Sequence, residues 1–178
     1  NTYINGCAKA APKDPTGVKQ RAFSLFEQIP EPDLRSFASI IDVYAKAEDA
    51  DAAVMYYNKM LESGLTPNTY VLNGVVDAFA AVGDVVNAQA YFDKLCNKDV
   101  VSFNTLMKGF VKNGDSKASQ ELFKRMQREG IKADVVTYDL LIRACAQRGE
   151  STVAEVEYFN EMAGRGIRLD SKSYIGMI

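Results

Sequence analysis

Residues 99–110 read DVVSFNTLMKGF and residues 134–145 read DVVTYDLLIRAC, so the chain repeats nearly the same stretch thirty-five residues later. Each copy opens on Asp-Val-Val and places one short polar side chain, Asn104 or Asp139, directly after an aromatic residue. Self-similarity at a spacing of about 20 to 50 residues is typical of proteins built from stacked repeats. The repetition therefore predicts that related copies of this stretch occur along the rest of the chain.

Aligned on this stretch, the 178-residue chain divides into five similar repeats and the start of a sixth. The first repeat lacks its opening residues, and the third, with 31 residues, is shorter than the second, fourth and fifth, which have 35 or 36. All are expected to form one solenoid domain. Repeats 1 to 6 are residues 1–33, with a loop insertion at 10–17, and residues 34–68, 69–99, 100–134, 135–170 and 171–178.

Each repeat has the apolar spacing of two amphipathic helices. In repeat 4, Phe103, Leu106, Met107 and Phe110 recur at i, i+3, i+4 and i+7, which is one face of a helix. A turn with glycine and an acidic residue separates the two helices: Gly83-Asp84, Gly114-Asp115 and Gly149-Glu150. First helices are expected to begin near Phe37, Leu72, Phe103, Tyr138 and Tyr174.

No strand-like alternation lasts more than a few residues. The prediction is an all-α fold, a right-handed helical-hairpin solenoid (α-α superhelix) of about five repeats plus a partial sixth. In such an array each repeat buries its apolar face only against its neighbours.

The composition excludes several classes of enzyme. The chain contains no histidine, so Ser-His-Asp catalysis, Cys-His catalysis and His-ligated metal sites lack their central residue. It also has no CxxC pair and no glycine-rich GxxxxGK[ST] phosphate loop. We therefore expect no enzymatic activity, no catalytic residue, no metal and no cofactor.

Charge, cysteines and hydropathy limit the partners further. Basic and acidic residues nearly balance, 21 against 23, so a polyanion has to meet a local basic patch. Cys7, Cys96 and Cys145 are odd in number and far apart, which predicts packed thiols in a reducing compartment rather than a disulfide scaffold. No apolar run approaches the about 18 residues of a membrane span and no targeting segment is recognisable, so membrane insertion is not expected.

Residues 100–134, VVSFNTLMKGFVKNGDSKASQELFKRMQREGIKAD, resemble the 35-residue pattern of the pentatricopeptide repeat (PPR) proteins almost end to end. The resemblance covers the whole chain, and the mixture of 31-, 35- and 36-residue repeats is similar to the mixed-length arrays of plant-type members. Tetratricopeptide repeats differ, because the W-x2-L-G-x2-Y pattern is absent. The resemblance implies a superhelix that binds single-stranded RNA with one repeat for each nucleotide.

In that family the fifth and last residues of a repeat read the base, and the second residue wedges between bases. For the second-position valines, burial against the next repeat is the competing interpretation. The resemblance implies the base-reading pairs Asn1/Asp33, Ala38/Asn68, Asn73/Asp99, Asn104/Asp134 and Asp139/Asp170. It implies the stacking residues Arg35, Tyr70, Val101, Val136 and Lys172.

The Asp or Asn at the end of every repeat also has a purely structural explanation. Both residues are favoured as helix caps and in turns. Capping alone does not explain why a second polar residue recurs at a fixed position inside the first helix. Two short polar groups from adjacent hairpins are suited to the Watson-Crick edge of a base, which presents donors and acceptors.

Cations follow the fifth position along the same helix face, because residues four and eight further on share its side. An ordinary solvated helix face is the alternative for each of them. Asp42 and Asp77 lie on the same stripe and are expected to weaken its attraction for phosphate. The candidate phosphate contacts are Lys9, Lys46, Lys108, Lys112 and Arg143.

The resemblance implies a preference for 5′-U-n-U-U-n-3′, since the family pairs Asn with a terminal Asp to select uracil. It further implies RNA processing, editing, stability or translation in a mitochondrion or chloroplast, with other proteins of a ribonucleoprotein complex as possible partners. The alternative is a structural scaffold or protein-interaction subunit of such an assembly, without base reading. Ala38, which offers no polar group in repeat 2, and the acidic pair of repeat 5 are consistent with that alternative.

Overall fold

The computed structural model describes Ile4, Cys7, residues 15–146 and residues 152–167. Within these ranges every regular element is a helix. None of the helices described is long and apolar enough to cross a membrane. The chain forms two compact units, Asn1–Asn97 and Lys98–Ile178.

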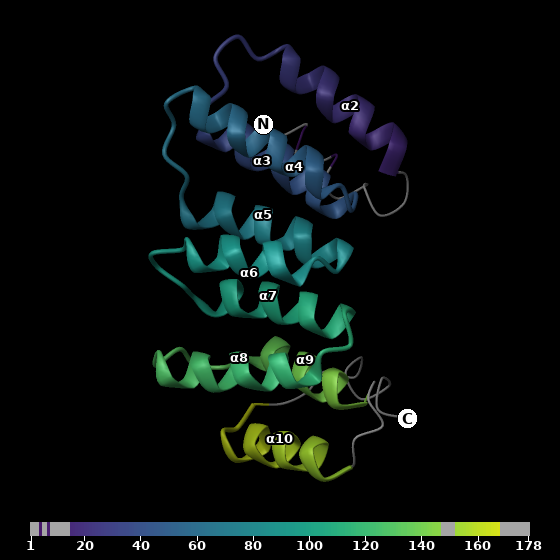
Figure 1. Cartoon of the computed structure of the whole chain (residues 1–178), viewed down its shortest axis with the longest axis vertical. Coiled ribbons are helices and arrows are strands. Elements are labelled where there is room, and N and C mark those ends of the chain that lie inside the picture. Colours follow the sequence, from purple (N-terminus) through teal and green to yellow (C-terminus); the bar gives the residue numbers. More distant parts are fainter. Residues whose placement is uncertain (1–3, 5–6, 8–14, 147–151, 168–178) are drawn as a thin grey trace. The chain divides into compact units, whose positions relative to one another are not determined.

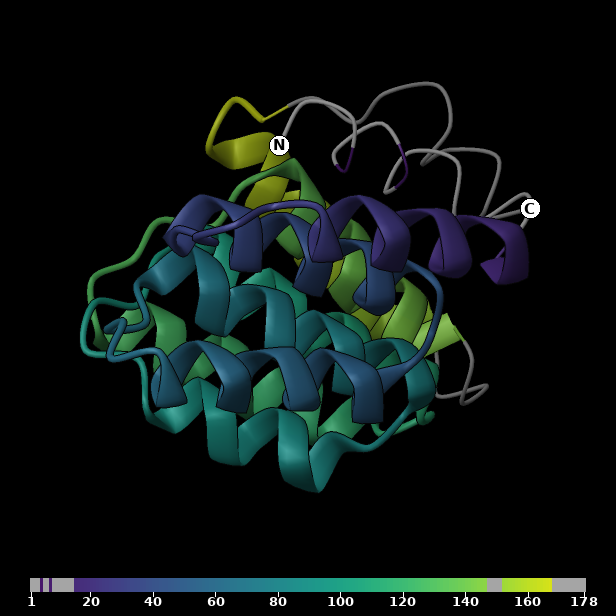
Figure 2. The ribbon, with the colours of Figure 1, turned by 90° about the horizontal axis from the view of Figure 1, so that it is seen from above.

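The first unit is a stack of helical hairpins. Helices α3 (Leu34–Lys46) and α4 (Ala50–Glu62) form one hairpin, and α5 (Thr69–Val82) and α6 (Val85–Asp93) form the next. Helix α5 packs against both α3 and α4 (Figure 1). Helix α2 (Pro15–Glu27) packs against α3, as the view from above also shows (Figure 2).

The second unit has the same construction. Helices α7 (Val100–Lys112) and α8 (Ser116–Arg128) form a hairpin, as do α9 (Val135–Ala146) and α10 (Thr152–Gly164). Helix α9 packs against α7 and α8, so the first helix of one hairpin contacts both helices of the hairpin before it. Apolar faces are thus buried between successive repeats, as expected for a solenoid.

The first helices begin one turn earlier than their apolar spacing predicts. They start at Leu34, Thr69, Val100 and Val135, whereas the sequence placed the starts near the aromatic or leucine three residues later. The N-terminus is fixed by the preceding Asp or Asn cap and not by the first buried side chain. Of the predicted insertion at 10–17, residues 10–14 lie outside the described residues, and Pro15 is the first residue of α2. Proline suits that position, where its missing N–H has no partner to lose.

Aromatic side chains fill much of the interior. In the first unit Phe26 makes edge contacts with Phe37 and Tyr56, each with ring centroids 5.1 Å apart. In the second unit Phe123 contacts Tyr138 at 5.8 Å. The prediction of three packed thiols is wrong for one of them: Cys7 and Cys145 are buried but Cys96 is exposed. Cys96 lies in the short connection after α6, which the 31-residue repeat leaves without a full second helix.

Each hairpin turn contains a residue whose backbone is in the left-handed conformation, and in repeat 2 that residue is not glycine. Gly83 and Gly114 have φ of 80° and 71°, and Glu48 occupies the equivalent position with φ 53°. A residue with a Cβ in this conformation costs about 1 to 2 kcal/mol. The acid that follows each of them caps the second helix: Asp49, Asp84 and Asp115 accept from the N–H three residues on.

Replacing Glu48 by glycine is therefore expected to stabilise the first unit. The gain from relieving φ is partly offset by the greater freedom of glycine in the unfolded chain, which leaves about 0.5 to 1 kcal/mol. Urea unfolding of Glu48→Gly against the parent chain measures the difference. Glu48→Ala, which keeps the Cβ, is the control and should show no such gain. A loss of stability in Glu48→Gly would contradict the prediction.

Candidate nucleic-acid interface

The last residue of each of repeats 1 to 4 caps the helix that follows it. The side-chain oxygens of Asp33, Asn68 and Asp99 accept from the third N–H of α3, α5 and α7 at 2.7, 3.0 and 2.8 Å. Asp134 does the same for α9, accepting from Thr137 N–H at 2.9 Å. The structural explanation for the recurring Asp or Asn is thus confirmed.

Two of the expected reading pairs lie within a single unit with both members described, and in one of them, Asn104 with Asp134, both side chains are polar. Asn104, in the second turn of α7, donates from Nδ2 to Oδ1 of Asp134, at the start of α9, over 3.0 Å. The two residues are thirty apart in sequence and both are partly exposed. The packing of α9 on α7 brings them together. Each therefore presents polar atoms to the same point on the surface of the second unit.

A third residue, Thr137, completes this pair, and the sequence reasoning did not single it out. Its hydroxyl lies 2.7 Å from Asn104 Oδ1 and 3.0 Å from Asp134 Oδ1, and it accepts from Asp134 N–H at 3.2 Å. Thr137 is fully buried. Thr137 is the third residue of its repeat, and repeat 4 has Ser102 at the same position. A hydroxyl at the third position of both repeats is the signal that the sequence offers.

The pKa of the Asp134 carboxyl lies below its usual value. Burial acts to raise this pKa, but the backbone N–H of Thr137, the amide of Asn104, the hydroxyl of Thr137 and the backbone N–H of Val136 together outweigh burial and lower it. Asp134 therefore remains an anion at neutral pH and can only accept hydrogen bonds. Its contacts with Asn104 and Thr137 all end on Oδ1, so Oδ2 takes no part in them.

The other expected reading positions fall into four groups. Ala38 is buried and offers no polar group, while its repeat ends in the capping Asn68. Asp139 forms an ion pair with Arg143 at 3.4 Å within α9. Asn73 and Asp99 belong to different units, so their pairing stays a prediction. Asn1 and Asp170 lie outside the described residues.

The described stacking candidates are all exposed. Tyr70, Val101 and Val136 have exposed fractions of 61%, 56% and 52%, and Arg35 is exposed as well. Val101 is thus not buried against the next repeat, whereas the repeat that follows Val136, residues 171–178, lies outside the described residues. Exposed valines on the first turn of α7 and α9 are available to contact a flat ligand. Lys172 lies outside the described residues.

Lys46 and Arg143, two of the candidate phosphate contacts, form ion pairs along their own helices. Lys46 pairs with Asp42 at 2.6 Å, four residues earlier on α3, and Arg143 pairs with Asp139 in the same spacing. Asp42 is thus the partner of the cation on its stripe, and its effect on phosphate binding stays a prediction. Lys108 and Lys112 are exposed on α7, and Lys9 lies outside the described residues.

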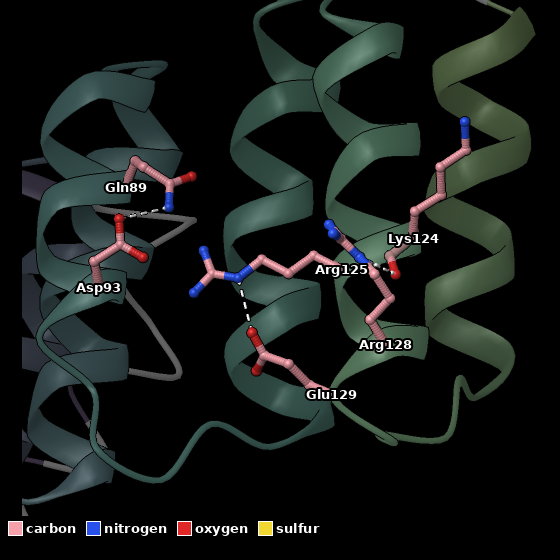
Figure 3. Close-up of polar contacts among 6 residues, drawn as sticks. All are labelled: Gln89, Asp93, Lys124, Arg125, Arg128 and Glu129. Atoms are coloured by element: carbon pink, nitrogen blue, oxygen red, sulfur yellow. Dashed lines mark hydrogen bonds and ion pairs between the residues drawn. The ribbon is translucent and has the colours of Figure 1, made fainter.

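Further charges lie on the second helices of the hairpins, where they interact locally (Figure 3). Arg125 Nε lies 2.8 Å from Glu129 Oε1 within the end of α8, and Arg128 Nε donates to the Lys124 carbonyl at 3.4 Å. On α6, Gln89 donates to Asp93 at 3.0 Å. Among the residues described, no group of three His, Cys, Asp or Glu side chains is placed to hold a metal ion.

The sequence pattern of the PPR repeat family matches residues 98–147, and that of the single PPR repeat matches residues 35–65 and 136–167. The chain belongs to the PPR repeat family. Among curated PPR proteins of Arabidopsis thaliana, it is 31% identical over 160 residues to At4g21065, which covers 87% of this chain and 26% of that protein. It is 29% identical to DOT4, chloroplastic, over 84% of this chain and 17% of that protein. The chain thus spans about a quarter or less of these PPR relatives.

Solved PPR structures share the fold. PPR10 in complex with an 18-nt psaJ RNA element has a TM-score of 0.82 and 24% identity, over 97% of this chain and 26% of PPR10. The PPR domain of Arabidopsis thaliana protein-only RNase P 1, in complex with tRNA, has a TM-score of 0.74 and 11% identity. That match covers 99% of this chain and 93% of the domain. The fold is therefore the all-α helical-hairpin solenoid of PPR proteins.

Proposed function

We propose that this chain binds single-stranded RNA in a sequence-selective way, with about one nucleotide for each repeat. The observation that carries the proposal is the convergence of Asn104 and Asp134, which places an amide and a carboxylate side by side on the surface. Together they offer a donor and acceptors to the edge of one base, which is how repeat proteins read single strands. The proposed preference is 5′-U-n-U-U-n-3′, with the fourth nucleotide facing this pair.

The exposed second positions support stacking beside each base. Tyr70 provides an aromatic face, Arg35 a guanidinium plane, and Val101 and Val136 apolar contact. Stacking of this kind contributes about 1 to 3 kcal/mol for each base. Five repeats should therefore bind weakly alone, and the chain, which spans a quarter or less of its relatives, is proposed to act as part of a longer array.

The compartment follows from the relatives and is part of the proposal. DOT4 carries the description chloroplastic, and a second relative, At3g02330, 28% identical over 66% of this chain, carries the description mitochondrial. We propose an organellar RNA as the target, whose processing, editing, stability or translation the array serves. Proteins of a ribonucleoprotein complex are further proposed partners.

Fluorescence anisotropy with short labelled RNAs tests the function. Oligonucleotides containing UNUUN are compared, at one stated salt concentration, with versions in which single uridines become C or A. We expect the dissociation constant to rise several-fold for a change at the fourth position, because mismatched polar groups there lose their partners. Equal binding of all sequences, or no binding, would favour the alternative of a protein scaffold without base reading.

A further inference from the structure

The polar network at Asn104 forms a closed cycle of hydrogen bonds. Asp134 is ionised and only accepts, so the Asn104 atom facing it has to be the donor Nδ2. Asn104 Oδ1 then faces Thr137, whose hydroxyl donates to it over 2.7 Å. The Thr137 hydroxyl oxygen in turn accepts from Asp134 N–H. The cycle runs from Asp134 through Thr137 and Asn104 back to Asp134.

The hydroxyl of Thr137 has one hydrogen and two acceptors within reach. Asn104 Oδ1 is the nearer, at 2.7 Å against 3.0 Å for Asp134 Oδ1. Asp134 Oδ1 already accepts from Thr137 N–H and from Asn104 Nδ2. Donation to Asn104 therefore satisfies more groups, and it fixes which end of the amide points toward Asp134.

Helix capping alone does not account for this hydroxyl. The cap of α5 forms without one, because Asn68 accepts from Val71 N–H at 3.0 Å and valine has no hydroxyl to return the bond. The repeat before α5 differs from the repeat before α9 at its fifth position. There the residue is the buried Ala38, so there is no amide that a hydroxyl could hold.

The sequence repeats this relation in every unit. A polar fifth residue is followed, in the next repeat, by a hydroxyl at the third position, and the apolar fifth residue is followed by valine. The pairs are Asn1 with Ser36, Ala38 with Val71, Asn73 with Ser102, Asn104 with Thr137 and Asp139 with Ser173. Ser36 and Ser102 share the burial of Thr137 and also bond to their capping carboxylates, at 2.7 and 2.8 Å.

We propose that Thr137 is a positioning residue for base reading: its hydroxyl holds the Asn104 amide with Nδ2 toward Asp134 and thereby sets the order of donor and acceptor that a base meets. The inference rests on the proposed function. In the held orientation, one Nδ2 hydrogen is donated to Asp134. The second Nδ2 hydrogen is the donor that we propose for the base. If the amide could rotate by half a turn, the acceptor Oδ1 would take the place of the donor Nδ2, and the selectivity for the base would fall.

The first measurement needs no RNA. In Thr137→Val the side chain keeps its shape and loses the hydroxyl, whereas Thr137→Ser keeps the hydroxyl. By NMR, the Asn104 side-chain NH2 resonances of the parent and of Thr137→Ser are expected to show slow exchange with water. In Thr137→Val this exchange is expected to be faster and the resonances shifted. Identical NH2 resonances in all three proteins would overturn the proposal.

The second measurement is the selectivity for the fourth nucleotide, given as the ratio of dissociation constants for C and U there. Thr137→Val is expected to lower this ratio about three- to tenfold, the worth of one hydrogen bond, and to leave the ratio at the third nucleotide unchanged. Thr137→Ser should retain it. Ser119→Ala is the matched control: it removes another buried hydroxyl of the second unit, bonded to the Asp115 carbonyl at 3.0 Å, away from the pair.

The outcomes separate this inference from the proposed function. An unchanged ratio in Thr137→Val overturns the positioning role while the function stands. An equal fall at every nucleotide, or the same fall in Ser119→Ala, also overturns it, because a general loss of stability would act in that way. If the parent chain binds no RNA, the proposed function fails, and the NH2 resonances alone decide whether Thr137 holds the amide.

Discussion

Asp134→Ala is expected to lower the free energy of unfolding of the second unit by about 1 to 3 kcal/mol and to abolish selectivity at the fourth nucleotide. The variant removes the cap of α9, whose third N–H then has no acceptor, and leaves Asn104 Nδ2 without its partner. Urea unfolding measures the first effect and RNA titration the second. Both stability and selectivity are expected to change strongly, because the same carboxylate caps α9 and is proposed to contact the base.

Asp115→Ala is the matched control for this variant. Asp115 caps α8 in the same unit, accepting from Ala118 N–H at 3.0 Å, and stands at no reading position. Its loss is expected to cost about 1 kcal/mol of stability and to leave the nucleotide ratios as they were. If Asp115→Ala changed selectivity as much as Asp134→Ala, the proposed reading role of Asp134 would be contradicted.

The penalty of Asp134→Ala should also depend on pH. The pKa of Asp134 is lowered on folding, since the hydrogen bonds from Thr137 and Asn104 outweigh the opposing effect of burial. Because the pKa is lowered on folding, the charged carboxylate stabilises the fold at pH values above the pKa of the unfolded chain, about 4. This stabilisation is lost as the pH falls through the lower pKa of the folded chain. The difference between the parent and Asp134→Ala is therefore expected to be full at pH 7 and smaller at pH 3.

Phe26→Ala is expected to destabilise the first unit by about 3 to 5 kcal/mol. The ring is 1% exposed and contacts Phe37 on α3 and Tyr56 on α4, so its removal leaves a cavity where three helices meet. Thermal unfolding followed by circular dichroism measures the loss. In a repeat array such a loss also weakens the neighbouring interfaces, because each repeat is held by the next.

Phe23→Ala provides the control on the same helix. Phe23 lies one turn before Phe26 on α2, but it is 49% exposed, so truncating it removes little buried surface. We expect a change within about 0.5 kcal/mol, as for other surface substitutions. Equal losses in the two variants would show that α2 does not dock through Phe26.

Much of the fold was predictable because its determinants are close together in sequence. The spacing of Phe103, Leu106 and Met107 gave a buried helix face, and these side chains are fully buried. The Asp or Asn before each first helix was recognised as a candidate cap, and its bonds span only three residues. The first helices start one turn before their apolar face, because the cap and not the first buried side chain sets the start.

The candidate site was predictable only in part. Asn104 and Asp134 were paired through the family resemblance, but the contact between their side chains depends on the packing of α9 on α7. The role of Thr137 was not found, since its hydroxyl bonds a side chain thirty-three residues away. The exposure of Val101 and Val136 and the exposure of Cys96 likewise depend on what the neighbouring helices leave uncovered.

The sequence by itself determined the repeat, the helical hairpins and the caps, because periodic burial and capping act within a few residues along the chain. Only the tertiary structure decided that DVVSFNTLMKGF and DVVTYDLLIRAC meet, with Asn104 of the first held between Asp134 and Thr137 of the second. The physical reason is that a hydrogen-bonded cycle across thirty residues needs two helices at a fixed separation. That separation is set by buried side chains of both helices together and not by either stretch alone.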